Sequence, residues 1–265
     1  MPRKILGVIP ARFASSRFPG KVLAKIAAKT MLQHVYERAN MATYLTSTII
    51  ATDDQRVYDA ARSFGARVTM TRSDHLSGTD RVAEAASADN AEIIVNIQGD
   101  EPLIDPAAID ASILPMVHEP GVVMSTLKKR IEDVREIGDP NVVKVVTNRE
   151  GEAIYFSRCP IPYEREPERA GAETQARTPV LLGTPHFKHI GLYVYQRDFL
   201  LSYSALPVGP LERAERLEQL RALENGFRIR VVETEYESLG VDTPEDLERV
   251  SRLFEASIFQ GVRNG

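Results

Sequence analysis

Short apolar runs alternate with helical patterns through the first two-thirds of the chain. Runs rich in Val and Ile predict buried strands at residues 4–9, 47–51, 67–70, 92–98 and 122–127. The patterns between them predict helices at residues 31–41, 54–63 and 80–88. Strands separated by helices of about 10 residues pair in parallel through right-handed crossovers. The pattern therefore predicts an α/β fold with a doubly wound, mostly parallel, Rossmann-like sheet.

The pattern changes in the middle of the chain. Residues 142–147 and 153–156 flank a short polar turn and predict a β-hairpin. The stretch 164–185 is polar and almost without aliphatic side chains, which indicates a mobile loop or lid. The remaining pattern predicts a strand at 189–195, one amphipathic helix at 211–223, a strand at 229–234 and a helix from Pro244. We expect a single domain, residues 1–265, with a hairpin-bearing insertion at about 128–210.

Composition excludes several classes of protein. Of the 265 residues, 43% are hydrophobic, which rules out a disordered chain. The single cysteine, Cys159, rules out a disulfide-stapled fold and a zinc site with several cysteine ligands. No apolar run approaches the roughly 20 residues that cross a bilayer. We expect a cytoplasmic protein that does not bind membranes.

The net charge of −4 is unevenly distributed. All charged residues before Glu37 are basic, although the chain as a whole is acidic. This distribution disfavours nucleic acid as a partner and favours a small polyanion. The basic residues of this first segment are Arg3, Lys4, Arg12, Arg17, Lys21, Lys25 and Lys29.

Residues 10–21 directly follow the first strand and carry three of these cations between Pro and Gly residues. Ligands sit at the carboxyl ends of strands in open α/β sheets, so this turn borders the expected site. Arg12 offers a planar fork and Lys21 a point charge to phosphate groups. Ser15 stands where a P-loop needs Gly, and no Gly-x-Gly occurs. On composition alone, a triphosphate-binding turn and a solvated surface loop are equally good interpretations.

Two acidic residues are candidate metal ligands. Asp100 follows the strand at 92–98 and the flexible Gly99, and a carboxylate there would repel phosphates unless a cation lay between them. Mg²⁺ suits this position because it takes one or two carboxylates together with phosphate oxygens. Asp242 precedes Thr243 and Pro244, which form a good helix start that does not require Asp242. Taken alone, Asp100 is better interpreted as the cap of a turn.

Two further segments carry polar side chains. In the loop 75–81, Ser77, Thr79 and Arg81 can bond a base or ribose. His186 and His189 are three residues apart, which on a strand places them on opposite faces. We therefore prefer a substrate hydrogen bond from His189 to a zinc pair, with a satisfied core histidine as the alternative.

These segments, taken together and in order, resemble the sugar-acid cytidylyltransferases, and among them the 3-deoxy-manno-octulosonate (Kdo) cytidylyltransferase, or CMP-Kdo synthetase, family. The resemblance spans nearly the whole chain, and the combination is specific although no single segment is. The segments that carry it are 9–12, 16–21, 51–54, 75–81, 95–102, 155–158, 189–193, 217–221 and 240–246.

The resemblance implies a nucleotidyltransferase fold and the transfer of CMP from CTP to the anomeric hydroxyl of Kdo, with release of pyrophosphate. It implies Mg²⁺ as cofactor, with two ions, and a homodimer with its contact on the insertion. The implied catalytic residues are Arg12 and Lys21 on the phosphates, and Asp100 and Asp242 on the metal. The implied substrate-binding residues are Pro10, Ala11, Ser16, Ser77, Arg81, Gln98, Arg158, His189, Tyr193, Glu218 and Gln219, with Arg158 suited to the carboxylate of the sugar acid.

Three alternatives stay open. A cytidylyltransferase for 8-amino-Kdo or a nonulosonic acid would differ only in the pocket between Arg158 and Gln219. A nucleotide-sugar glycosyltransferase commonly has Asp-x-Asp after the strand, whereas Pro102 occupies the third position here. A binding module without activity would not need both Asp100 and Asp242.

Overall fold

The computed structural model describes residues 3–14, 17–163, 165 and 184–263, with side chains in the last helix up to residue 255. The predicted phosphate contact Ser16 lies outside the described residues. The same holds for nearly all of the predicted lid at 164–185.

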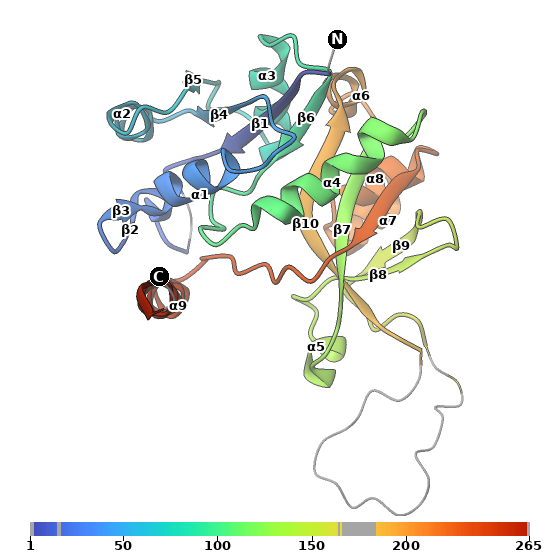
Figure 1. Cartoon of the computed structure of the whole chain (residues 1–265). Coiled ribbons are helices and arrows are strands. Elements are labelled where there is room, and N and C mark those ends of the chain that lie inside the picture. Colours follow the sequence, from blue (N-terminus) through green and yellow to red (C-terminus); the bar gives the residue numbers. More distant parts are fainter. Residues whose placement is uncertain (1–2, 15–16, 164, 166–183, 264–265) are drawn as a thin grey trace, which may run out of the picture.

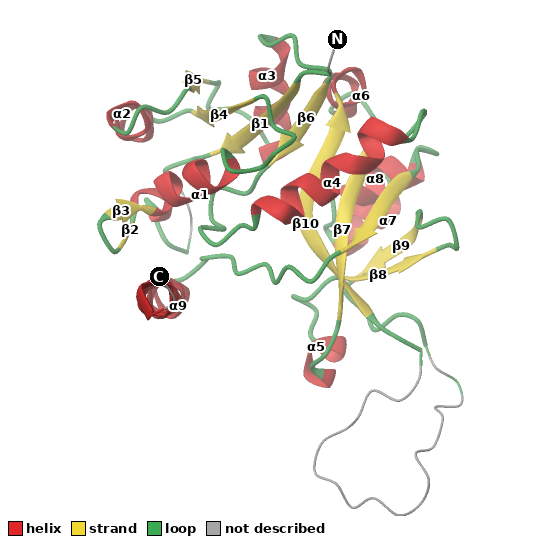
Figure 2. Ribbon diagram, viewed as in Figure 1, coloured by secondary structure: helices red, strands yellow, loops and turns green. Residues whose placement is uncertain are grey.

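Figures 1 and 2 show a twisted sheet with helices packed on both faces. The strands are β1 (Ile5–Pro10), β2 (Lys25–Ile26), β3 (Lys29–Thr30), β4 (Ser47–Thr52), β5 (Val68–Met70), β6 (Ile93–Asn96), β7 (Met124–Arg130), β8 (Lys144–Thr147), β9 (Ala153–Ser157), β10 (Phe187–Gln196) and β11 (Ile229–Glu233). The helices are α1 (Met31–Ala39), α2 (Gln55–Ser63), α3 (Gly78–Ser87), α4 (Pro106–His118), α5 (Val134–Gly138), α6 (Arg197–Tyr203), α7 (Pro210–Glu215), α8 (Gln219–Glu224) and α9 (Pro244–Arg263), with a 3₁₀ turn at Lys21–Leu23.

The main sheet has the strand order β11-β7-β10-β6-β1-β4-β5 and is mixed. Neighbouring strands from β6 to β5 are parallel, as are β11 and β7. The predicted doubly wound, mostly parallel α/β class is thus confirmed. The predicted strand at 189–195 is β10, which runs antiparallel to both β6 and β7.

The core lies in two layers, one on each face of the sheet. Alternate residues of β1 face opposite layers, with Ile5 and Ile9 in one and Leu6 and Val8 in the other. The first layer packs under α1, α2 and α4, and the second under α3, α6 and α8. This arrangement is what the continuous apolar character of the strands predicts, because strands covered on both sides have no polar face.

The hairpin formed by β8 and β9 is confirmed, and β8 joins the sheet by pairing with β10. The stretch 128–210 therefore begins within β7 and includes β10, which lies inside the main sheet. The division of the chain into domain and insertion stays a prediction.

The helix predictions are confirmed for α1, α2 and α3, and α9 begins at Pro244 as expected. Thr243 and Asp246 form the predicted capping box, in which each side chain accepts from the backbone amide of the other. Helix α3 begins earlier than predicted, at Gly78, because Ser77 caps it by accepting from the amide of Asp80 at 3.1 Å.

The prediction of one helix at 211–223 is wrong. The segment forms α7 and α8, separated at Arg216, whose backbone is left-handed with φ 52°. Glu215 accepts from the Ser157 hydroxyl and from the Arg158 amide at the end of β9. These tertiary bonds fix the end of α7, so the helical periodicity did not decide the local backbone.

The helices α4, α5 and α6 were not predicted. The start of α4 carries a clear signal, since Asp105 accepts from the amide of Ala107 and Pro106 occupies the first turn. No helix in the described ranges is both long enough and apolar enough to cross a membrane.

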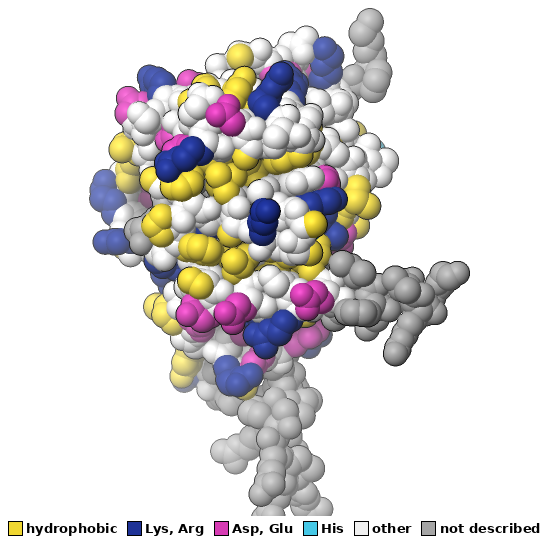
Figure 3. All heavy atoms as spheres, turned by 90° about the vertical axis from the view of Figure 1, so that its left-hand side faces the viewer, with side chains coloured by type: hydrophobic (Ala, Val, Ile, Leu, Met, Phe, Trp, Pro, Cys, Tyr) yellow, Lys and Arg dark blue, Asp and Glu magenta, His cyan; other side chains and the backbone are white. Residues whose placement is uncertain are grey.

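Figure 3 shows the side of the molecule that lies on the left in Figure 1, toward the β5 edge of the sheet. Hydrophobic side chains form bands there, with basic and acidic side chains between them. Met41 and Met70 are among the exposed apolar residues, at 69% and 45%. Both signs of charge share this face, so it does not carry a uniform electrostatic field.

Candidate active site

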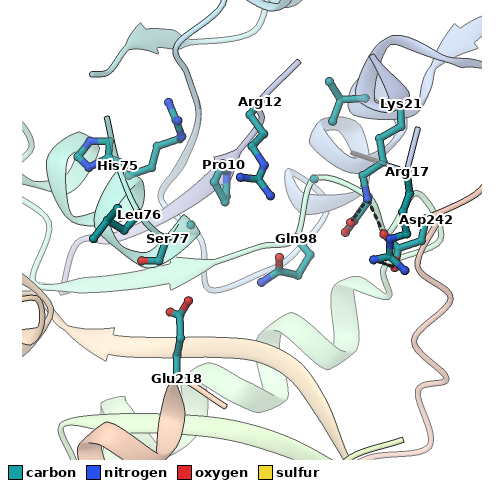
Figure 4. Close-up of a pocket in the computed structure, with 15 residues that line it drawn as sticks. Pro10, Arg12, Arg17, Lys21, His75, Leu76, Ser77, Gln98, Glu218 and Asp242 are labelled. Atoms are coloured by element: carbon teal, nitrogen blue, oxygen red, sulfur yellow. Dashed lines mark hydrogen bonds and ion pairs between the residues drawn. The ribbon is translucent and has the colours of Figure 1, made fainter. Parts of the chain in front are cut away.

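A cleft of about 370 Å³ opens where the central parallel strands β1 and β6 end. In an open α/β sheet this end of the strands is the favoured place for a ligand. Figure 4 shows side chains from distant parts of the chain that point toward one another across it. The residues that line it are Pro10, Arg12, Arg17, Lys21, Val22, His75, Leu76, Ser77, Gly78, Arg81, Gln98, Gly99, Asp100, Glu218 and Asp242.

Lys21 joins the two predicted metal ligands. Its ammonium donates to Asp100 Oδ2 at 2.6 Å, to Asp242 Oδ1 at 2.9 Å and to the carbonyl of Val241 at 3.0 Å. Burial alone would lower the pKa of Lys21, but the two carboxylates outweigh it and raise that pKa above its ordinary value. Two carboxylates 142 residues apart in the sequence therefore converge on one cation.

Close backbone contacts bring these segments together. The amide of Val241 donates to the carbonyl of Asp100 at 2.9 Å. A Cβ on Gly99 would lie 2.9 Å from the carbonyl oxygen of Pro10, closer than side chains tolerate. Glycine is thus required for β6 to turn directly beside the end of β1.

Phe13 and Gly20, on the two sides of the basic turn, are in direct contact. Gly20 has φ 72° and donates to the carbonyl of Phe13 at 2.8 Å, and the guanidinium of Arg56 lies 3.4 Å from the centre of the Phe13 ring. Arg12 is exposed and points into the cleft, with no ion pair to any residue in the described ranges (Figure 4). Ala11 is buried, and its amide donates to the carbonyl of Ala51, so it attaches the start of the turn to β4.

Sequence reasoning did not single out Arg17 as a site residue. Its guanidinium donates to Asp242 Oδ2 at 2.8 Å. The signal was available, because Arg17 is one of three cations in the turn after β1, but nothing in the sequence says which acid it meets.

The loop before α3 forms a second wall. The Ser77 oxygen already accepts as helix cap, and its hydroxyl proton is left to donate. Arg81 is only 5% exposed and donates to Thr71 and to Asp53, the latter at 2.8 Å. His75, which sequence reasoning placed in the loop without a role, lines the cleft and contacts Glu84 on α3. The predicted base-reading loop is therefore rigidly attached to α3.

Gln98 and Glu218 form the third wall. Gln98 donates to the carbonyl of Gly191 at 3.2 Å, and Glu218 accepts from the Thr79 hydroxyl at 2.9 Å. Partial loss of water raises the pKa of Glu218, against the lowering effect of Thr79. Tyr203 donates to the backbone carbonyl of Glu218 at 2.5 Å, which holds the start of α8 at the cleft.

Three predicted residues lie beside the cleft without lining it. His189 and Tyr193 share one face of β10, with ring centroids 5.4 Å apart. His189 Nε2 lies 2.9 Å from the hydroxyl of Thr126, and desolvation lowers the pKa of His189 to about 3. Gln219 is 3% exposed, and its Nε2 has no hydrogen-bond partner in the structure as described. A buried donor without a partner is unfavourable by about 1–3 kcal/mol, which makes Gln219 a good binding residue for an acceptor.

Arg158 lies outside the cleft lining. Its guanidinium donates to the carbonyls of Glu215 and Pro140 at 2.7 and 2.9 Å. The buried ammonium of Lys144 in turn bonds the carbonyl of Arg158 at 2.7 Å. In this conformation Arg158 joins the hairpin to the end of α7, and a role with substrate stays a prediction.

Asp100 and Asp242 are the residues that could hold a divalent cation. Among the described residues, no group of three His, Cys, Asp or Glu is arranged to hold a metal. Two carboxylates in a cleft shared with Arg12 instead match the needs of Mg²⁺ that is bound partly by phosphate oxygens. His186 and His189 have different partners. His186 lies 3.0 Å from the carbonyl oxygen of Pro162, whereas His189 contacts Thr126.

A doubly wound sheet whose strand ends present a basic turn to two carboxylates defines a nucleotidyltransferase. The model of the cytidylyltransferase family matches residues 6–231. The chain belongs to this family, in the branch of the 3-deoxy-manno-octulosonate cytidylyltransferases.

Relatives and solved structures agree on this assignment. The chain is 80% identical over 265 residues to 3-deoxy-manno-octulosonate cytidylyltransferase of Solibacter usitatus (strain Ellin6076), with 100% of each chain covered. It is 56% identical over 246 residues to the enzyme of the same description from Syntrophotalea carbinolica, covering 93% of this chain and 96% of that one. The solved structure of CMP:2-keto-3-deoxy-manno-octonic acid synthetase complexed with CTP is 43% identical, with TM-score 0.88 and coverage of 96% and 99%.

Proposed function

We propose that this protein transfers CMP from CTP to the anomeric hydroxyl of Kdo and releases pyrophosphate. The convergence of Asp100, Asp242 and Lys21 in a cleft with Arg12 is the observation that carries the proposal. The relatives that carry this name support the choice of Kdo and CTP as substrates. The C2 hydroxyl oxygen of Kdo would form a bond to the α-phosphorus as the bond from that phosphorus to the α,β-bridging oxygen breaks. Pyrophosphate would leave with the bridging oxygen, and the hydroxyl proton would pass to water.

Mg²⁺ is part of this proposal, and Asp100 and Asp242 would hold it. When bound, the metal supplies Lewis acidity that lowers the pKa of the attacking hydroxyl and offsets phosphate charge. The charge of the triphosphate also favours a second Mg²⁺ ion, because a triphosphate carries more charge than one divalent cation neutralises.

The chain's own cations act on the leaving group. Arg12 provides a fork of donors, and Lys21 a point charge, for the phosphate oxygens that become more negative as pyrophosphate departs. Such transfers depend on positioning and charge stabilisation more than on covalent help. A pKa of about 3 makes His189 a poor proton acceptor at neutral pH, which supports a mechanism without a histidine general base.

The sugar acid would bind against the wall of the cleft formed by Gln98 and Glu218. His189, Tyr193 and Gln219 would extend this binding surface. The unpaired Nε2 of Gln219 supports an acceptor group of the substrate at that position. Neutral His189 can hydrogen-bond a hydroxyl without bringing a charge.

We further propose a cytoplasmic homodimer that supplies lipopolysaccharide biosynthesis. The hairpin supports a contact on the insertion, because Ile154 on β9 is 61% exposed and Tyr163 is 87% exposed. Exposed apolar side chains near a strand edge are favourable for association.

The substrate assignment is tested by measuring pyrophosphate release. CTP or UTP is offered with Kdo, 8-amino-Kdo or N-acetylneuraminate, with and without Mg²⁺. We expect rapid release only with CTP, Kdo and Mg²⁺ together. Faster release with 8-amino-Kdo would assign the other sugar acid, and no release with any acceptor would reject the proposal.

Asp100→Asn tests the metal ligand directly. We expect turnover to fall by at least about 100-fold, the scale for one preorganised electrostatic contact. Asp198→Asn, an exposed site on α6, is the matched control and should behave as wild type. Near wild-type turnover of Asp100→Asn would remove Asp100 from the site.

A further inference from the structure

Asp242 reaches the cleft on a segment without regular structure. Residues 234–243 connect β11 to α9 and form neither helix nor strand, and Figure 1 shows them as the orange-red trace that runs to α9. Such a segment has large conformational freedom unless side chains restrict it. The position of Asp242 relative to Asp100 therefore depends on what holds this segment.

Glu101, which does not line the cleft, holds this segment through Tyr236. The Tyr236 hydroxyl donates to Glu101 Oε2 at 2.8 Å, and Ser238 also hydrogen-bonds the Glu101 carboxylate. Glu101 follows Asp100 directly, yet it is 7% exposed and does not line the cleft. Asp100 therefore lines the cleft, whereas the adjacent Glu101 binds the segment 234–243.

Glu101 and Tyr236 are both buried, so each needs a hydrogen-bond partner. A buried carboxyl group is strongly unfavourable unless donors satisfy it, and Tyr236 and Ser238 are those donors. Near Tyr236 in the same segment, Glu237 pairs with Lys129 and Lys188, but its side chain is 42% exposed, so this contact contributes less.

We propose that Glu101 and Tyr236 are positioning residues that set the spacing of Asp100 and Asp242 and so the affinity of the site for its metal. This inference rests on the proposed function, because it requires the two carboxylates to share a cation. The backbone hydrogen bond from Val241 to Asp100 joins the same two segments next to the proposed metal ligands. It therefore couples the position of the segment at Tyr236 to the spacing of Asp100 and Asp242. Supporting residues behind metal ligands typically change metal affinity by about 10–100-fold when altered.

The test compares Tyr236→Phe, Glu101→Gln and wild type in the full-length protein. Tyr236→Phe removes the donor; we expect the half-saturating Mg²⁺ concentration to rise about 10-fold, while KM for CTP at saturating Mg²⁺ changes less than about twofold. Glu101→Gln keeps an acceptor for Tyr236 and should retain a nearly wild-type Mg²⁺ requirement. Ser238→Ala, at a partly exposed position, should give an intermediate effect and serves if Tyr236→Phe folds poorly.

Hydrogen exchange without metal or nucleotide gives a readout independent of activity. We expect residues 234–243 to exchange at least about 10-fold faster in Tyr236→Phe, with the sheet unchanged. Tyr155→Phe removes a similar Tyr-to-Glu hydrogen bond, to Glu215, and should alter neither the Mg²⁺ requirement nor this exchange.

The outcomes separate the two proposals. Unchanged Mg²⁺ requirement and unchanged exchange in Tyr236→Phe would overturn the positioning role. A lower melting temperature alone, without either change, would overturn it too, because it would show a purely structural contact. Should Asp100→Asn and Asp242→Asn also leave the Mg²⁺ requirement intact, the proposed metal site itself would be at fault.

Discussion

Lys21 occupies the point at which the separate parts of the site meet. Its ammonium lies between Asp100 and Asp242, which would repel each other without it. The same ammonium is the one expected to contact phosphate, so nucleotide and carboxylates compete for it. A single side chain thus joins the two carboxylates in this structure and is also the one proposed to bind phosphate.

Lys21→Ala should lower kcat/KM for CTP by about 10–100-fold, because a charge-assisted contact to phosphate is lost. Steady-state kinetics with pyrophosphate detection measure this. Lys25→Ala removes an exposed lysine of the same basic segment and should have no such effect. Equal kinetics of Lys21→Ala and wild type would place Lys21 outside the phosphate site.

His189 gives a pH-dependent stability with a defined sign. Its pKa is lowered from 6.5 to about 3, so below pH 6.5 the unfolded chain binds a proton that the folded protein does not. The free energy of unfolding should therefore fall by up to about 2 kcal/mol between about pH 6.5 and pH 4.5. Denaturant titrations across this range should show a shallower pH dependence of the free energy of unfolding for His189→Gln than for wild type. Identical curves for His189→Gln and wild type would contradict this contribution of His189 to the pH dependence of stability.

At the scale of elements, the break between α7 and α8 decides where Glu218 and Gln219 lie. In a continuous helix from Leu211, the helical periodicity alone would set the positions of these two residues. The left-handed backbone at Arg216 redirects the chain, so α8 starts at the cleft. Contacts of Glu215 with the end of β9 fix this geometry.

Arg216→Gly should raise the free energy of unfolding by up to about 1 kcal/mol, because a left-handed backbone is unfavourable for residues with a Cβ and not for glycine. Ala214→Gly, an exposed position inside α7, should instead lower it by about 1 kcal/mol. Chemical denaturation of both variants measures the contrast. Destabilisation by both changes would show that the left-handed backbone is not under strain.

At the scale of the whole molecule, the sheet brings the ends of β1 and β6 together with the segment before α9. The hairpin β8–β9 extends from the same sheet through β10 and presents Ile154 to solvent. This geometry separates the cleft from the surface proposed for dimer formation.

Ile154→Glu should weaken the proposed dimer at least about 10-fold, since a charge would have to be desolvated in an apolar contact. Sedimentation equilibrium measures the association, and the melting temperature of the monomer checks folding. Leu253→Glu, an exposed apolar position on α9, is the control. A dimer of wild-type affinity in Ile154→Glu would exclude this face.

Much of the fold could be predicted from sequence because its strands and first helices carry strong local patterns. The strand β1, the cap of α2 by Asp54 and the capping box at Thr243 depend on neighbours within a few residues. The antiparallel direction of β10 and the break at Arg216 depend on contacts between distant segments. Local periodicity cannot report such contacts, and for that reason both were missed.

The sequence by itself determined which side chains are candidates for the chemistry: a basic turn after β1, an acid after β6 and an acid before α9. Only the tertiary structure decided that Asp100 and Asp242 share one ammonium, that Arg17 meets Asp242, and that Glu101 turns away to hold Tyr236. The physical reason is that residue type and local spacing fix what a group can do, whereas distances between groups far apart in sequence arise from packing of the whole sheet.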